Sequence, residues 1–252
     1  MIEIIILSLI QGITEFLPIS SSSHLIIISE YFSFENQSLS IDISLHIGSF
    51  FAVLIYFSKD ILSFAKNKML FFKIVISSLP LMAAGYIVIK FNLIDQFRNI
   101  KVIGWTTLIF GVLLFISDKF KINNNINNNF TLKSAIFIGF FQVLSIMPGV
   151  SRSGITITAS RFLNFNRYDS TKISFLLSIP TLGAVTLFGF YNIINSDNIN
   201  FSFINIISII LSFIFSFLTI KYFLKFIKNF SFYIFIIYRI ILGSIILAFG
   251  YL

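Results

Sequence analysis

Two short polar stretches interrupt an otherwise apolar chain, and they contain the residue types that acid–base and anion chemistry require. The first is QGITEFLPISSSSHL, from Gln11 to Leu25, and the second is SIMPGVSRSGITIT, from Ser145 to Thr158. Carboxylates and imidazoles transfer protons, hydroxyls act as nucleophiles or donors, and an arginine holds two oxygens of one anion. Each stretch therefore supplies part of a candidate site, and the chain must fold so that the parts meet.

The second stretch has the composition of an anion-binding turn at the start of a helix. Arg152 stands between Ser151 and Ser153, and Gly154 and Thr156 follow. Glycines let backbone N–H groups approach a ligand, hydroxyls donate to its oxygens, and arginine grips two phosphate oxygens at once. These residues predict an anion site, with phosphate as the expected group.

The first stretch contains a carboxylate in an apolar setting. An ionised Glu15 between apolar segments costs several kcal/mol unless water, a cation or a partner receives it, so we expect it to line a polar cavity. Gln11 is four residues earlier, on the same helical face. These two oxygen-bearing side chains are candidate ligands for Mg²⁺ or Ca²⁺. His24 is a candidate general acid–base or nucleophile.

The composition indicates that the elements which position these groups are embedded in a membrane. Of the 252 residues, 57% are hydrophobic and 11% are charged, whereas soluble domains carry about 25% charged residues. Runs that are apolar on every side predict helices rather than barrel strands, and they cover residues 43–57, 71–89, 100–116, 173–191, 201–220 and 232–251. We predict an all-α polytopic membrane protein with a single integral membrane domain over residues 1–252.

The two polar stretches correspond to each other as an internal repeat. Pro148 matches Pro18 at a spacing of 130 residues, and the serines three and five residues after each proline match as well. Paired helix breaks in the two halves of a membrane protein indicate a site at the repeat interface. We predict two inverted repeats, approximately 1–120 and 130–252, each with a broken or re-entrant helix pair that meets the other at mid-membrane.

The net charge of +8 comes mainly from links between the apolar runs. Basic residues gather at 59–73, including Lys66, at 161–172 and at 221–228, whereas the link at 192–200 holds only Asp197. The positive-inside rule places the basic links in the cytoplasm, which explains the charge without a nucleic-acid partner. The first positive charge is Lys59, so we expect the N-terminus to be mature structure rather than a cleaved signal.

The motifs QGITEFLPISSSSH and PGVSRSGIT resemble the two signatures of the undecaprenyl-diphosphate phosphatase family, which is implicated in bacitracin resistance. LHIGSFFAV at 45–53 and FIIYRI at 235–240 extend the resemblance over nearly the whole chain. It implies a multi-pass enzyme of the bacterial inner membrane whose site opens to the outer face. The implied reaction is the hydrolysis of undecaprenyl diphosphate to undecaprenyl phosphate and inorganic phosphate. The implied partners are the polyprenyl diphosphate and membrane lipids, with no nucleic acid, and a homodimer is compatible with the sequence.

The resemblance also implies residue roles. Glu15, Ser21, His24 and Arg152 would be catalytic, and Glu15 would hold a divalent cation together with Gln11. Gln11 stands where many members have a second glutamate, which weakens the charge of the cation site. The substrate-binding residues would be Ser151, Ser153, Gly154 and Thr156.

Two alternatives stay open on the sequence. The nucleophile is Ser21, His24 or a metal-bound water, since all three are chemically able. The same inverted-repeat site would also suit a transporter or flippase of an anionic lipid or solute. The sequence leaves His46 outside the site and favours a structural role for Arg239.

Overall fold

The computed structural model describes residues 1–32, 34, 38–64, 67–91, 99–195 and 202–251. These residues form helices and no β-strand, which confirms the all-α prediction. Six of the described helices are long and apolar enough to cross a membrane: α3 (Leu39–Tyr56), α5 (Lys68–Lys90), α7 (Ile100–Asp118), α11 (Arg167–Asn195), α12 (Phe203–Ile227) and α13 (Tyr233–Tyr251). The shorter elements are α1 (Ile2–Thr14), α2 (Ser21–Phe32), α4 (Ser58–Phe64), α8 (Ile126–Asn129), α9 (Leu132–Val143), the 3₁₀ turn η1 (Leu144–Ile146) and α10 (Arg152–Phe162).

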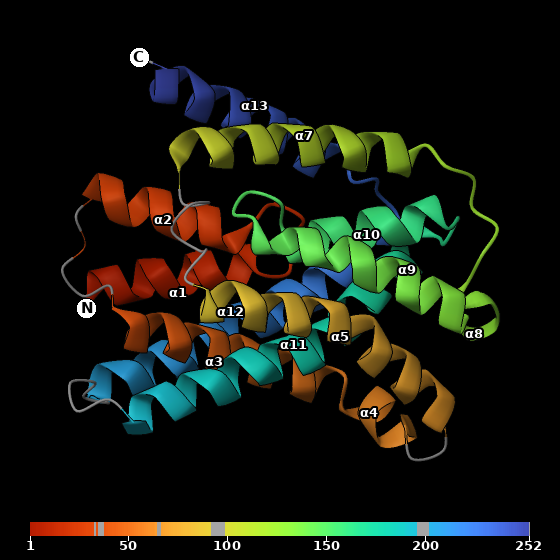
Figure 1. Cartoon of the computed structure of the whole chain (residues 1–252), viewed down its shortest axis with the longest axis horizontal. Coiled ribbons are helices and arrows are strands. Elements are labelled where there is room, and N and C mark those ends of the chain that lie inside the picture. The colour runs from red at the N-terminus through yellow and green to blue at the C-terminus, as the bar shows by residue number, and fades with distance from the viewer. Residues whose placement is uncertain (33, 35–37, 65–66, 92–98, 196–201, 252) are drawn as a thin grey trace.

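The six long helices correspond to the six apolar runs of the sequence, and the chain is therefore a multi-pass membrane protein. In Figure 1 they lie roughly side by side, with α4 and α8 at one end of the bundle and both chain termini at the other. Large apolar side chains on the bundle's outer face, such as Phe72 and Phe249, are exposed. An apolar exterior is suited to contact with lipid tails.

The helix breaks fall where the two prolines predict them. α1 ends at Thr14, shortly before Pro18, and the next helix begins at Ser21. α9 and η1 likewise end before Pro148, and α10 begins at Arg152. α1 and α9 have 13 and 12 residues, which gives lengths of about 20 and 18 Å, short of the roughly 30 Å hydrocarbon core.

Small and hydroxyl-bearing residues let the central helices approach closely. A Cβ at Gly48 of α3 would lie 2.4 Å from the carbonyl oxygen of Ile209 on α12, so only glycine fits there. Beside it, the Ser49 hydroxyl lies 3.2 Å from that of Ser212 and 2.9 Å from that of Ser216. Close backbone approach and interhelical hydrogen bonds replace the hydrophobic effect as the force between helices in lipid.

Most basic residues of the described ranges lie at one end of the bundle, whereas Lys90 and Lys101 lie at the other. At the basic end Asp118, at the end of α7, pairs with Arg167 at 2.7 Å, and Lys172 pairs with Asp60 at 2.6 Å. Lys66 and residues 196–200 of the predicted outer link lie outside the described residues. α4 and α8 lie at this basic end, and the N- and C-termini lie at the opposite end (Figure 1).

Candidate functional site

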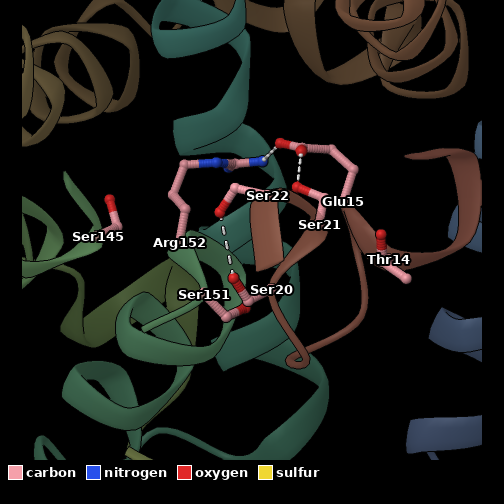
Figure 2. A pocket seen from close by; sticks show the side chains of 8 residues that line it. All are labelled: Thr14, Glu15, Ser20, Ser21, Ser22, Ser145, Ser151 and Arg152. Atoms are coloured by element: carbon pink, nitrogen blue, oxygen red, sulfur yellow. Dashed lines mark hydrogen bonds and ion pairs between the residues drawn. The ribbon is translucent and has the colours of Figure 1, made fainter. Parts of the chain in front are cut away.

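The two helix breaks meet around a small polar cavity of about 80 Å³. Figure 2 shows Arg152 extending from the start of α10 towards one oxygen of Glu15, with the Ser21 hydroxyl below the carboxylate and facing its other oxygen. The pocket is deep enough in the protein that the side chains of Glu15 and Arg152 are only 7% and 12% exposed. It is lined by Thr14, Glu15, Ser20, Ser21, Ser22, Ser145, Ser151 and Arg152.

Glu15 is the centre of this polar cluster. One carboxylate oxygen, Oε1, accepts a hydrogen bond from Arg152 Nη2 at 2.8 Å. The other, Oε2, accepts from Ser21 Oγ at 2.7 Å and from Gln11 Nε2 at 3.2 Å. The structure thus unites residues that lie 137 positions apart in the chain, as the predicted interface between the two stretches requires.

Local structure fixes where each of these groups points. Gln11 and Glu15 are one helical turn apart at the end of α1, where the Glu15 backbone N–H still donates to the carbonyl of Gln11 at 3.0 Å. Ser151 caps α10, because its hydroxyl accepts from the N–H of Gly154 at 3.1 Å. Arg152 is therefore the first residue of α10, at the end of a helix that attracts anions.

The predicted phosphate ligands separate into two groups. Ser151 lines the polar cavity, as its predicted role requires. Ser153 instead donates to the carbonyl of Leu17 at 2.7 Å, and the Thr156 hydroxyl donates to the carbonyl of Arg152 at 2.8 Å. Hydroxyls in helices commonly bond to backbone carbonyls in this way, so their side chains support the turn rather than face the cavity. Gly154 contributes the N–H that Ser151 caps.

His24 is also held by protein partners. Its Nδ1 lies 2.6 Å from the carbonyl oxygen of Ser20, and its Nε2 lies 2.6 Å from the hydroxyl of Tyr238 on α13. A carbonyl only accepts, so Nδ1 donates, and in the neutral ring Nε2 accepts from the tyrosine. His24 lines neither of the two cavities described here, so the structure ties the imidazole to α13 instead of placing it beside Glu15.

His46 lies beside Gln11 and Glu15, although the sequence did not predict it as part of the site. Its Nδ1 lies 3.1 Å from the amide nitrogen of Gln11, and it lines a second cavity beside Glu15. An amide nitrogen only donates, so Nδ1 accepts this hydrogen bond. No spacing signal could have found the contact, because 35 residues separate the partners. The only hint was the position of His46 within the family-like LHIGSFFAV segment.

The second cavity is larger and mostly apolar, with a volume of about 700 Å³. Its lining comes chiefly from α5 and α11, and it shares Glu15, Ser145 and Arg152 with the polar cavity. From Leu81 to Lys90 it follows α5 over ten residues, whose first and last Cα atoms are about 14 Å apart along the helix axis. The remaining lining residues are His46, Met82, Gly85, Tyr86, Ile89, Thr181, Leu182, Ala184, Val185 and Phe188. A charged group at Glu15 and Arg152 could therefore carry an apolar tail along α5.

Gln11 and Glu15 fit a cation that needs few protein ligands. The amide oxygen of Gln11, Oε1, is buried and has no hydrogen-bond partner among the described residues, and it belongs to the residue that already contacts Glu15. The described residues contain no cluster of three or more His, Cys, Asp or Glu side chains that could hold a metal. One carboxylate and one amide oxygen suit Mg²⁺, which keeps water and phosphate oxygens in its shell.

Known proteins match this chain over nearly its full length. Residues 4–245 match the family described as bacitracin resistance protein BacA. The chain belongs to the BacA family. Among the BacA relatives, a protein named undecaprenyl-diphosphatase from Pelagibacter ubique (strain HTCC1062) is 47% identical over 97% of this chain and 96% of its own length. Proteins of the same name from Saccharophagus degradans and Jannaschia sp. are 39% and 35% identical, over 95% and 98% of this chain and 94% and 97% of theirs.

Proposed function

We propose that this BacA-family protein is an integral membrane phosphatase that hydrolyses undecaprenyl diphosphate to undecaprenyl phosphate and inorganic phosphate. The reaction would recycle the lipid that carries cell-wall precursors. The observation that carries the proposal is a polar cavity containing Arg152, Glu15 and serine hydroxyls that adjoins a long apolar cavity. The first suits a diphosphate and the second a prenyl tail, and the relatives are named for this activity.

Ser21 is the nucleophile that the geometry favours, with Glu15 as its base. The distance of 2.7 Å between Ser21 Oγ and Glu15 Oε2 lies within the reach of about 2.6–3.2 Å expected for such a pair. In the proposed step, Glu15 takes the hydroxyl proton as Oγ bonds to the terminal phosphorus. The bond from phosphorus to the bridging oxygen breaks, and undecaprenyl phosphate leaves. Water then attacks the phosphorus of the phosphoserine, the bond from phosphorus to Oγ breaks as Glu15 returns the proton to Oγ, and inorganic phosphate is released.

Arg152 would stabilise the charge that spreads over the phosphoryl oxygens during transfer. To do so it must turn partly from Glu15 towards the substrate, which also frees the carboxylate to act as a base. Ser151 would donate to a phosphate oxygen from the helix cap, while Ser153 and Thr156 hold the turn. His24, predicted as a catalytic residue, would serve the reaction by fixing the Ser20 carbonyl beside the nucleophile.

Gln11 and Glu15 would hold a divalent cation, with Mg²⁺ favoured over Ca²⁺ by the small number of protein oxygens. When bound, the cation would neutralise charge on the diphosphate oxygens. The unpartnered Oε1 of Gln11 supports this assignment. Because this set has a single carboxylate, the protein would supply little of the cation's charge compensation, and the rest would be left to the substrate.

The predicted inverted repeats are part of this proposal, with boundaries near 1–120 and 130–252. In support, α3 packs against α11 and α7 against α13, as expected for elements related by a twofold axis in the membrane plane. The contact of α1 with α12 has a counterpart in that of α9 with α5. The helix pair α1–α2 starts at the end of the bundle with the termini, and α9–α10 starts at the opposite, basic end (Figure 1).

Charge supports a site that opens to the outer face of the inner membrane. The basic end of the bundle contains, among others, Lys59, Lys121, Lys133, Arg167, Lys221 and Lys228, at the ends of α3, α7, α9, α11 and α12. The positive-inside rule makes that end cytoplasmic. The apolar cavity runs along α5 towards Lys90, at the other end. The cavity beside Glu15 and Arg152 therefore extends towards the outer end of the bundle, which supports access to the site from the outer face.

The test is phosphate release from undecaprenyl diphosphate by purified protein in detergent, with and without Mg²⁺. Wild type should release phosphate only with the cation, and Glu15→Gln and Arg152→Ala should each lower the rate by about 10³-fold while eluting as folded protein. If folded wild type releases no phosphate with any divalent cation, the phosphatase proposal fails. Transport of an anionic lipid or solute would then be tested by leaflet-specific labelling in vesicles.

A further inference from the structure

Arg239 is a fully buried arginine, and each of its three guanidinium nitrogens donates to a backbone carbonyl. It lies on α13 with 0% exposure. Its Nη1 donates to the carbonyls of Pro18 and Val150, both at 3.1 Å, and its Nη2 donates to that of Gly149 at 2.9 Å. Nε donates to the carbonyl of Thr107 on α7 at 3.2 Å. One guanidinium thus joins the turn after α1, the turn before α10 and the pair α7–α13.

Both turns contain strained backbone at their helix caps. Ser20 precedes α2 with φ 71°, and Ser151 caps α10 with φ 67°. Such left-handed conformations are unfavourable for residues other than glycine and persist only where the surroundings hold them. Two carbonyls near these caps, those of Pro18 and Val150, are held by Arg239. Arg239 therefore holds the backbone close to the two strained helix caps.

The catalytic geometry depends on how the two turns sit relative to each other. Glu15 and Ser21 flank the first turn, and Arg152 follows the second. Apart from the Glu15–Arg152 pair, the direct ties include the N–H of Gly149 to Ser20 Oγ, at a long 3.3 Å, and Ser153 Oγ to the Leu17 carbonyl at 2.7 Å. Substrate binding at Arg152 would loosen the ion pair, which leaves these hydrogen bonds and the contacts of Arg239 with both turns to maintain the register during the reaction.

We propose that Arg239 is the positioning residue that fixes the two turns in register and thereby aligns the groups proposed to transfer the phosphoryl group. This rests on the proposed function for its effect on turnover, whereas the fixing of the turns does not. Arg239 lines neither cavity, so it acts through the backbone and not on substrate. A rigid planar fork is required, because it reaches carbonyls in several directions at once, whereas lysine presents its donors from one point.

Arg161 provides a matched control at the basic end of the bundle. It is also 0% exposed, and it also donates to backbone carbonyls, those of Asp118 at the end of α7 at 3.1 Å, of Phe120 at 2.5 Å and of Phe165. Arg161→Lys and Arg239→Lys both replace a buried carbonyl-binding fork by a single cation. The carbonyls of Arg239 belong to the site and those of Arg161 do not; in addition, the Nε of Arg161 lies 3.7 Å from the carboxylate of Asp118.

The experiment compares both variants as purified, monodisperse protein at matched folded concentration. Misplacement of reacting groups by about 1 Å costs about 10²-fold in rate, so Arg239→Lys should lower kcat by about 10²-fold with KM within a few-fold of wild type. Arg161→Lys should keep kcat within a few-fold, whatever it does to Tm. Added guanidinium should restore part of the kcat of Arg239→Ala. Equal kcat values for the two lysine variants would overturn the proposal.

Hydrogen exchange gives a readout that does not need activity. Amides at 149–155 should exchange faster in Arg239→Lys than in wild type or Arg161→Lys, because the carbonyls of the same turn have lost their donor. Unchanged exchange there would refute the positioning role even if kcat fell. If the turns loosen as expected but wild type releases no phosphate, the phosphatase proposal fails and the fixing of the turns by Arg239 stands.

Discussion

Ser21 and Glu15 are expected to act as one catalytic unit, and a double-mutant cycle tests this. Their hydrogen bond of 2.7 Å joins the nucleophile directly to its base. Removing a general base costs about 10²–10⁴-fold in rate, so Ser21→Ala and Glu15→Gln should each lower kcat by about 10³-fold, or about 4 kcal/mol of transition-state stabilisation. Independent losses would add to about 8 kcal/mol in the double variant.

If Ser21 and Glu15 act as one unit, the second substitution causes no further loss of rate. The double variant should then be only about 10³-fold slower than wild type. The assay is phosphate release from undecaprenyl diphosphate in mixed micelles, with enough enzyme to measure slow rates. Ser23→Ala is the control, since its hydroxyl contacts Ser20 Oγ at 3.1 Å and does not line the polar cavity. Losses that multiply to about 10⁶-fold would refute the nucleophile–base pairing.

Three other substitutions test the site and the fold. Gln11→Glu should lower the Mg²⁺ concentration needed for half-maximal activity, since a second carboxylate adds ligand charge; an unchanged or higher requirement in a Mg²⁺ titration would argue against a cation at Gln11. Gly85→Phe should impair turnover of undecaprenyl diphosphate more than that of a short-chain prenyl diphosphate, because the ring would enter open space in the apolar cavity; equal effects in a chain-length series would place the tail elsewhere. Gly48→Ala should destabilise by about 1–3 kcal/mol through overpacking against α12, lowering Tm in detergent, whereas Gly85→Ala should not; equal Tm values would contradict the packing argument.

Sequence alone predicts the scaffold and the central pair of this site. Runs of apolar residues give the long helices, because a bilayer demands length and uniform apolarity. Pro18 and Pro148 give the breaks, and the cost of isolated charge at membrane depth predicts that Glu15 and Arg152 share a polar cavity. These inferences hold because each rests on a local rule with a large energy.

The remaining parts depend on contacts that no local rule encodes. His46 reaches Gln11, and His24 reaches Tyr238, across gaps of 35 and 214 residues. Ser153 and Thr156 have hydroxyls that could face either ligand or backbone, and only the packed structure decides between them. Arg239 was expected to be structural, but the particular carbonyls it binds follow from how α13 docks against both turns.

The ion pair between Glu15 and Arg152 also bears on how ligands are ranked. Every anion that enters must compete with the carboxylate, 2.8 Å from Arg152 Nη2, for the same guanidinium. A diphosphate ester carries more negative charge than the monophosphate ester left after hydrolysis, so it recovers more of that cost. Breaking the ion pair would therefore lower the affinity of every anion for the site, and it would weaken binding of the monophosphate product more than binding of the diphosphate substrate. Under the proposed reaction, the spent lipid would be expelled by the enzyme's own carboxylate, and accumulation of product would inhibit only weakly.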